Sequence, residues 1–215
     1  MKTRKLVPYC LVVLLGGCGP IFSLHALYTK ETITFEEKLL GTWLVDPNKP
    51  GETWEFARLE ESAAGCLPAD LQDQAAKCYR VTLTDEKRKE SIVACPVRLQ
   101  DRLFLDLMPS QFPGGEENLE NADSELNAAF FLRLHTFAQV SFSRDQLTIR
   151  LTDDDGFKDL LKAEPKAVEY TTVEKRPILT ASTQELQAFV TKYADDKRLF
   201  TEGEPLIRKP SSVAK

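Results

Sequence analysis

The chain has 215 residues, with 28 Lys or Arg and 33 Asp or Glu, and its formal net charge is −5 at pH 7. This length fits one domain with a full hydrophobic core. An acidic balance without a block of basic residues argues against binding to nucleic acid and against electrostatic docking on anionic lipid.

Residues 1–17 have the pattern of a secretory signal peptide. Lys2, Arg4 and Lys5 come first, and an apolar run follows over residues 6–15. This run is too short to cross a hydrocarbon core of ~30 Å as a stable helix. Small residues then lead to Cys18, before which we expect the signal to be cut.

The segment Leu15-Gly16-Gly17-Cys18 resembles the lipobox of bacterial lipoproteins. The resemblance implies a diacylglycerol thioether on the Cys18 sulfur and an acyl group on its amine. Because two or more acyl chains hold a protein stably on a membrane, this anchor would suffice. Gly19 stands where many inner-membrane lipoproteins carry Asp, so the resemblance favours the outer membrane of the cell envelope, facing the periplasm. An ordinary signal peptide that contains a cysteine is the alternative.

Residues 18–33 are expected to tether the lipid to the domain. The segment is apolar for a linker, and the sequence leaves open whether it lies on the membrane surface or against the domain. The domain itself is expected over residues 34–208, and a disordered polar tail over 209–215. Thr34-Phe35-Glu36-Glu37 fits a capping box that begins a short helical turn, which Gly41 ends.

Alternating apolar segments separated by turn residues predict eight strands. They cover residues 42–46, 53–60, 79–84, 92–99, 103–107, 132–142, 147–151 and 168–173. The alternation is strictest from Leu147 to Thr152. Residues 111–127 form an acidic excursion that we interpret as a solvated loop, with a calcium site as the alternative.

The C-terminal part predicts two helices. Asp153-Asp154-Asp155-Gly156 precedes a short one, and Ser182-Thr183-Gln184-Glu185 is a capping box for an amphipathic one that ends near Ala194. A last short strand is expected within residues 199–207. Eight strands in meander order favour a closed antiparallel barrel, because closure removes free sheet edges. The predicted fold is therefore mainly β, with a short N-terminal helical turn and one or two C-terminal helices.

Gly41-Thr42-Trp43, after a short helical turn, resembles the Gly-x-Trp start of lipocalins. Residues 178–189 resemble the segment that follows the eighth lipocalin strand. The resemblance implies a lipocalin-like barrel whose closed end is plugged by Trp43 and covered by an arginine, for which Arg176 is the candidate. Bacterial lipocalins are outer-membrane lipoproteins, in agreement with Cys18. The chain departs from the family in having no Thr-Asp-Tyr type motif and a helix between the seventh and eighth predicted strands.

Three cysteines remain in an oxidising compartment once Cys10 is removed and Cys18 is lipidated. Pairing the alternating faces of residues 79–84 and 92–99 inward would place Cys95 inside the barrel and Cys78 outside. We therefore expect a Cys66–Cys78 disulfide across a loop insertion, with Cys95 as a buried free thiol; a bond that involves Cys95 stays open. No Cys-x-x-Cys motif or His pair accompanies these cysteines, so the sequence predicts no metal site.

Motifs for enzymatic chemistry are missing from the sequence. It has no Gly-x-Ser-x-Gly elbow, phosphate-binding loop or dinucleotide fingerprint, so we expect a protein that is not an enzyme and needs no cofactor. His25 lies in the tether. His135 lies on the strand face opposite Leu134, which predicts a surface or rim imidazole. Arg133 or His135 pointing inward would instead favour a binding pocket with a polar anchor.

Three functions remain in view. The first is a lipid-anchored envelope protein that binds an apolar small molecule inside the barrel, which predicts a cavity of at least ~300 Å³. The second is an envelope protein–protein interaction module with a solid barrel core and an exposed apolar patch. The third is a hydrolase-type enzyme, which needs His135 near a carboxylate or Ser in a cleft. The residues that would contact a ligand are not predicted.

Overall fold

The computed structural model describes residues 19–110 and 132–210. The predictions for the signal peptide, for lipidation at Cys18, for the acidic excursion at 111–127 and for most of the C-terminal tail lie outside the described residues.

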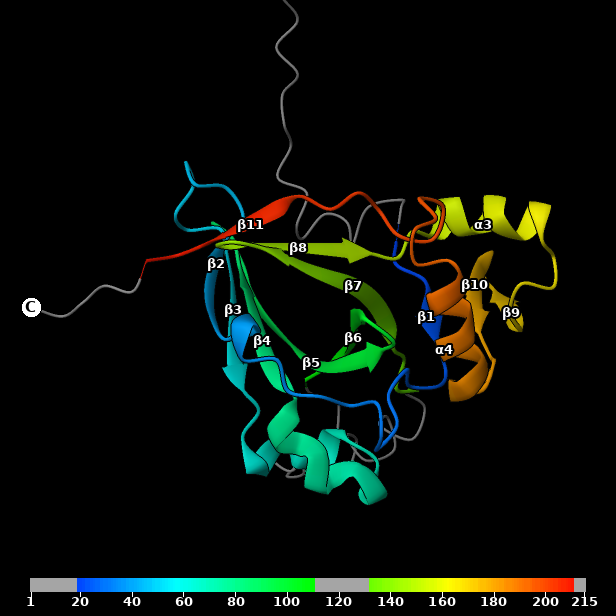
Figure 1. Ribbon diagram of the computed structural model, residues 1–215, viewed down its shortest axis with the longest axis horizontal. Helices are drawn as coiled ribbons and strands as arrows, with labels where there is room; N and C mark the ends of the chain where they lie inside the picture. The colour runs from blue at the N-terminus through cyan, green and yellow to red at the C-terminus, as the bar shows by residue number, and fades with distance from the viewer. Residues whose placement is uncertain (1–18, 111–131, 211–215) are drawn as a thin grey trace, which may run out of the picture.

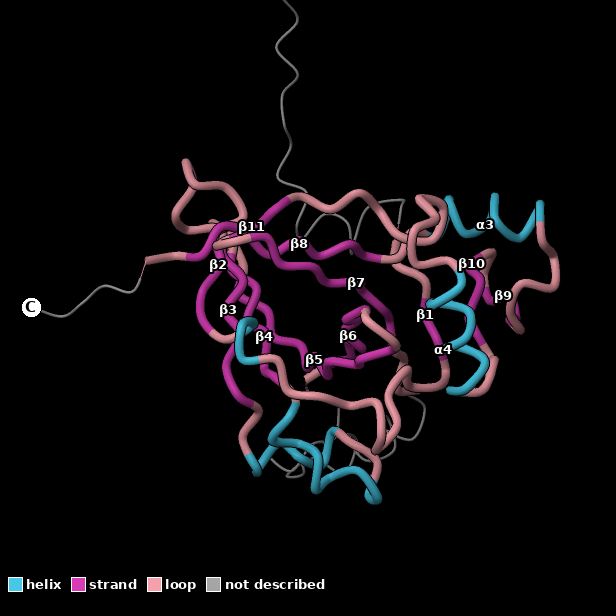
Figure 2. The backbone as a smooth tube through the Cα atoms, viewed as in Figure 1, coloured by secondary structure: helices cyan, strands magenta, loops and turns pink. Residues whose placement is uncertain are grey.

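Eight strands form a closed antiparallel barrel, which confirms the predicted fold class (Figure 1). In their order around the barrel they are β11 (Pro205–Arg208), β2 (Gly41–Leu44), β3 (Thr53–Arg58), β4 (Tyr79–Thr84), β5 (Lys89–Leu99), β6 (Arg102–Pro109), β7 (Thr136–Ser143) and β8 (Gln146–Leu151). Figure 2 shows these strands as a ring with the helices outside it.

The eighth barrel strand differs from the prediction. Residues 168–173 were expected in this place, but β11 closes the barrel between β8 and β2. β9 (Tyr170–Val173) instead pairs with β10 (Arg176–Leu179), which also pairs with β1 (Phe22–Ser23) in a small sheet beside the barrel. The reason lies in side-chain burial: all four residues of β9 are exposed, whereas Leu206 of β11 is buried in the barrel.

Two helical regions lie outside the barrel. α3 (Asp154–Ala163) and α4 (Thr183–Lys192) lie beside the small sheet, and the predicted capping box of α4 is present between Ser182 and Glu185. The 3-10 helices η2 (Glu61–Cys66) and η3 (Ala69–Lys77) fill the insertion between β3 and β4. The predicted helical turn before β2 is the 3-10 helix η1 (Glu37–Leu39), but its N-cap is Glu36 rather than Thr34.

The barrel has a buried core on each side of its wall. The inner core lies inside the barrel and contains Trp43, Phe56, Tyr79 and Leu105. The outer core lies between the outer face of β5–β7 and the segments that cover it. Its members include Phe104, Phe137, Phe157 and Phe189.

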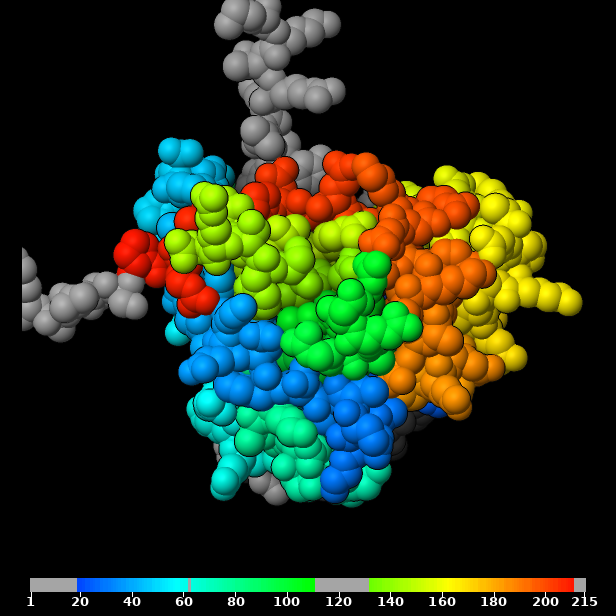
Figure 3. Space-filling model, in the orientation of Figure 1, coloured from blue at the N-terminus to red at the C-terminus, as the bar shows by residue number. Residues whose placement is uncertain are grey.

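Residues 19–33, which we call the N-terminal segment, lie against the domain. Ile21, Leu27, Tyr28 and Ile33 are buried in the outer core. Ser23 exchanges two backbone hydrogen bonds of 2.9 Å with His135. In the space-filling view, early residues (blue) lie directly against the β5–β6 region (green) and α4 (orange) (Figure 3). The described part of the expected tether is therefore part of the fold.

The face assignment of β5 corrects the predicted disulfide. The cross-strand pair Tyr79↔Ala94 places Ala94 in the inner core, so Val93 and Cys95 face the outer core instead. Both faces of β5 are buried, and apolar alternation is then a poor guide to which face points inward.

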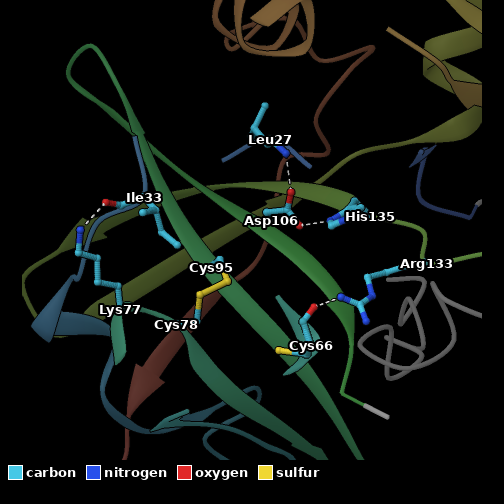
Figure 4. Close-up of a disulfide and its surroundings, with 9 residues drawn as sticks. All are labelled: Leu27, Ile33, Cys66, Lys77, Cys78, Cys95, Asp106, Arg133 and His135. Atoms are coloured by element: carbon cyan, nitrogen blue, oxygen red, sulfur yellow. Dashed lines mark hydrogen bonds and ion pairs between the residues drawn. A yellow bond between two sulfur atoms is a disulfide. The ribbon is translucent and has the colours of Figure 1, made fainter. Parts of the chain in front are cut away.

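The predicted Cys66–Cys78 bond is therefore wrong. Cys78 comes directly before β4, on the same outer side as Cys95, and the two form a disulfide with a Cα–Cα distance of 4.4 Å (Figure 4). Cys66 is the buried free thiol. Burial raises the pKa of this thiol, so it is a weak nucleophile.

Candidate functional site

An apolar pocket of about 270 Å³ lies at one end of the barrel, which we call the open end. Its volume is slightly below the ~300 Å³ expected of a small-molecule site. The inner faces of the strands supply half of the lining residues, namely Trp54, Leu83, Ile92, Leu107, Thr136 and Leu151. Met108, Pro109, Leu132 and Leu134 complete the strand-side wall.

Strand register explains why these residues meet. Trp54 pairs with Leu83 across β3 and β4, so both side chains point to the inner face at the same level. Leu83 lies near the end of β4 and Ile92 near the start of β5, which places both beside the connection at residues 85–88. The pocket is thus formed by strand residues at one end of the inner face, where the inner core does not fill the barrel.

The chemistry of the pocket is almost entirely apolar. Of the described residues that line it, only Thr136 and Trp54 carry a polar side-chain group, a hydroxyl and an indole N–H. The Thr136 hydroxyl lies 3.3 Å from the hydroxyl of Thr152, within hydrogen-bond distance. Among the described residues, no charged side chain lines the pocket. Such a lining can bury hydrocarbon, but it offers no partner to a charged or strongly polar group.

The N-terminal segment supplies the remaining wall of the pocket, through Pro20 and Phe22. Two hydrogen bonds fix it there. The Ile21 N–H donates to the Thr152 hydroxyl at 3.1 Å, and the Asp154 N–H donates to the Gly19 carbonyl at 3.1 Å. The sequence could not place these residues, because their partners lie more than a hundred positions away.

The predicted tryptophan, Trp43, is the cross-strand partner of Trp54, but its side chain does not line the pocket and reaches instead toward η1, at the end of the barrel that we call the closed end. Trp43 is buried, and its indole N–H donates to the Leu39 carbonyl at 2.9 Å. The covering arginine is Arg208, whose guanidinium lies 4.1 Å from the Trp43 ring centroid and donates to two carbonyls of the preceding turn. Gly41 has φ +109°, and a Cβ there would lie 3.2 Å from the Arg208 guanidinium. The positive φ favours glycine at this position, and a Cβ would also crowd the Arg208 guanidinium.

Arg176 was the wrong candidate for this role. It is exposed at the start of β10 in the small sheet, where its guanidinium lies beside Gly19. The segment resemblance located the helix correctly, but the barrel strand that returns past Trp43 comes after α4 rather than before it.

A polar pair lies in the outer core. The Asp106 carboxylate is fully buried, and one oxygen lies 2.7 Å from Nδ1 of His135 while the other accepts the Leu27 N–H at 2.6 Å (Figure 4). Burial raises the pKa of Asp106 above its ordinary value, and His135 offsets part of this effect. The predicted surface position of His135 is wrong, because the N-terminal segment covers it.

Neither predicted polar anchor points into the pocket. His135 faces Asp106 outside the barrel, and Arg133 donates a hydrogen bond to the Cys66 carbonyl. Asp106 was missed in the sequence, although a lone acid inside the apolar stretch from Leu103 to Met108 could have marked it. His135 does have a carboxylate within reach, but neither of the two lines the open-end pocket.

The 19–110 and 132–210 parts of the chain contain no group of three or more His, Cys, Asp or Glu residues that could hold a metal ion. Among the helices of these same residues, none is both long and apolar enough to span a membrane. In comparisons with known proteins, no family model, curated protein or solved structure matches the chain.

Proposed function

We propose that this protein is a lipid-anchored protein of the bacterial cell envelope that binds a small apolar molecule, such as an acyl chain, without transforming it. The pocket at the open end carries this proposal, because a closed barrel with an apolar mouth can enclose one small ligand. The lipobox-like Leu15-Gly16-Gly17-Cys18 supports the anchor and the envelope location.

Binding in this pocket would rest on burial of hydrocarbon. Each buried CH₂ group contributes about 0.8 kcal/mol, which corresponds to roughly fourfold in affinity. Because the described residues of the wall carry no charged group, a carboxylate or other polar head would remain outside in water. The expected ligand class is therefore an amphiphile whose tail, rather than its head, is recognised.

A chain-length series tests this mechanism. The anchor-free chain from Gly19 onward, which holds all the described contacts, is titrated with saturated fatty acids of increasing length while Trp54 fluorescence is followed. Affinity should rise roughly fourfold per added CH₂ until the pocket is filled, and then level off. An affinity that does not depend on chain length would contradict tail recognition.

A matched pair of variants locates the site. Leu134 is half-buried in the pocket wall, so Leu134→Lys places a charge there and should weaken binding at least tenfold. Val173→Lys makes the same change at a residue of β9 that is 50% exposed and remote from the pocket, and should bind as the wild type does. Equal affinities for all three proteins would place the bound molecule elsewhere.

The second candidate function is a protein–protein interaction module. It is favoured by β9, the outer strand of the small sheet, which exposes Tyr170 and Val173 at 40% and 50%. A strand edge of this kind can pair with an extended segment of a partner. A pocket that takes up no fatty acid in the titration would leave this candidate as the better one.

A further inference from the structure

The wall of the pocket and the expected attachment residue are almost adjacent in the chain. Pro20 lines the pocket, and only Gly19 separates it from Cys18. Two residues span at most about 7 Å. The acyl chains expected on Cys18 would therefore begin within about that distance of the pocket wall.

The chain that follows Cys18 is held against the domain from Gly19 onward. The Gly19 carbonyl accepts the Asp154 N–H, and the Ile21 N–H donates to the Thr152 hydroxyl, so both residues are held by residues that follow β8. Beyond them, the N-terminal segment is buried in the outer core. A flexible tether would let the barrel turn freely above a membrane, whereas this arrangement fixes which part of the barrel lies next to the anchor.

The surface around this point suits a lipid bilayer. Leu132 lines the pocket and yet is 74% exposed, and Phe22 and Leu134 are half-buried beside it. The guanidinium of Arg176 lies beside Gly19 and is exposed, where it can reach lipid phosphates. Apolar side chains next to a cation match the change from hydrocarbon to headgroups at a membrane surface.

We propose that the open end of the barrel faces the bilayer to which the protein is anchored, and that an acyl chain of a membrane lipid passes directly from the bilayer into the pocket. This inference rests on the proposed function, and adds the orientation of the pocket and the source of its ligand. During direct passage the acyl chain is not exposed to water. Transfer through water would carry a free-energy cost that grows with the length of the acyl chain.

Brominated lipids provide the test, because bromine quenches tryptophan only at short range. The lipidated protein is reconstituted in phosphatidylcholine vesicles with or without dibromostearoyl chains. Trp54 lines the pocket, whereas its cross-strand partner Trp43 does not line it and is buried under Arg208. We expect brominated vesicles to remove at least half of the Trp54 emission. They should remove clearly less of the Trp43 emission, which Trp54→Phe isolates, because Trp43 is the cross-strand partner of Trp54 but does not line the pocket.

A spacer variant separates orientation from pocket binding. Twenty Gly and Ser residues, starting with Gly, are inserted between Cys18 and Gly19, which keeps the anchor, the pocket and both tryptophans. Such a spacer extends roughly 25 Å on average and frees the barrel from the membrane surface. Quenching should then fall at least threefold, and quenching as strong as in the parent protein would overturn the inference.

The anchor-free chain from Gly19 onward completes the design, with dibromostearic acid as the dissolved probe. If this probe quenches Trp54 but brominated vesicles leave the lipidated protein unquenched, the inference fails and the proposed function stands. A pocket already filled by an acyl chain of Cys18 would give that result. If the dissolved probe does not quench Trp54 either, the proposed function fails as well.

Discussion

The inner and outer faces of β5 and β6 are both buried, but they are built from different chemistry. The inner face carries apolar side chains such as Ala94 and Leu105. The outer face carries the Cys78–Cys95 disulfide and the buried Asp106. On that face, the covering N-terminal segment and His135 satisfy the carboxylate.

The two faces therefore have different roles, one in stability and the other in the proposed ligand binding. The outer face fixes the N-terminal segment, through contacts that are costly to remove because they leave buried polar groups without partners. The inner face ends in an apolar pocket, which can contact the hydrocarbon part of a ligand but few other groups. Asp106 and the disulfide do not line the pocket, so changes there should lower stability without altering the ligand affinity of the folded protein, and changes at the open end should do the reverse.

The largest effect is expected at Asp106. Asp106→Ala leaves the buried Leu27 N–H without its acceptor and Nδ1 of His135 without its partner, and should lower the free energy of unfolding by about 4 kcal/mol. Asp106→Asn keeps an oxygen that accepts the Leu27 N–H and an amide N–H that donates to Nδ1 of His135, as the protonated Asp106 carboxyl does, and should cost far less. Urea unfolding of the three proteins measures both changes; equal losses for the two variants would mean that the hydrogen bonds do not carry the effect.

The dependence of folding stability on pH tests the Asp106 site independently. Because the pKa of Asp106 is raised in the folded protein, its protonated form favours folding. This contribution is complete below the ordinary Asp pKa of about 4 and is lost as the pH rises through the raised value. The stability of the wild type minus that of Asp106→Asn should therefore fall with rising pH over this range. The opposite slope would show that the folded protein favours the carboxylate.

The disulfide should give the next largest effect. Cys78 and Cys95 are 17 residues apart, and replacing both by Ser should cost about 3 kcal/mol by releasing a loop of this size in the unfolded chain. Fatty-acid affinity should stay unchanged, since neither sulfur lines the pocket. Cys66→Ala is the control: it removes a small buried side chain, costs about 1 kcal/mol and leaves the bond intact. A Cys66–Cys78 peptide in unreduced digests of the wild type would contradict the structure.

The sequence predicted the elements whose signals are local. Strict alternation identified β8, the Ser182–Glu185 capping box identified α4, and the Gly-x-Trp segment identified the start of the barrel. Each of these signals lies within a few neighbouring residues. The closed barrel followed from the number of strands and their order.

The errors concern pairing between distant segments. The inward face of β5 could not be read, because the outer core makes its other face apolar too. The closing strand β11 is short and has only Leu206 buried, so residues 168–173 carried a stronger strand signal. The pocket wall at Pro20 and Phe22 depends on hydrogen bonds to residues after β8, which no local pattern reveals.

Arg208 gives the smallest of these stability effects and tests the closed end of the inner face. Its guanidinium lies over Trp43 and donates to the Leu40 and Lys38 carbonyls, so Arg208→Ala should cost about 2 kcal/mol. Arg176→Ala removes the same side chain from an exposed strand and should change stability by less than about 0.5 kcal/mol. Fatty-acid affinity of the anchor-free chain should be unaffected in both. A loss of affinity in Arg208→Ala would mean that the two ends of the barrel are coupled through the Trp43–Trp54 cross-strand pair, and the inner face would then act as one unit.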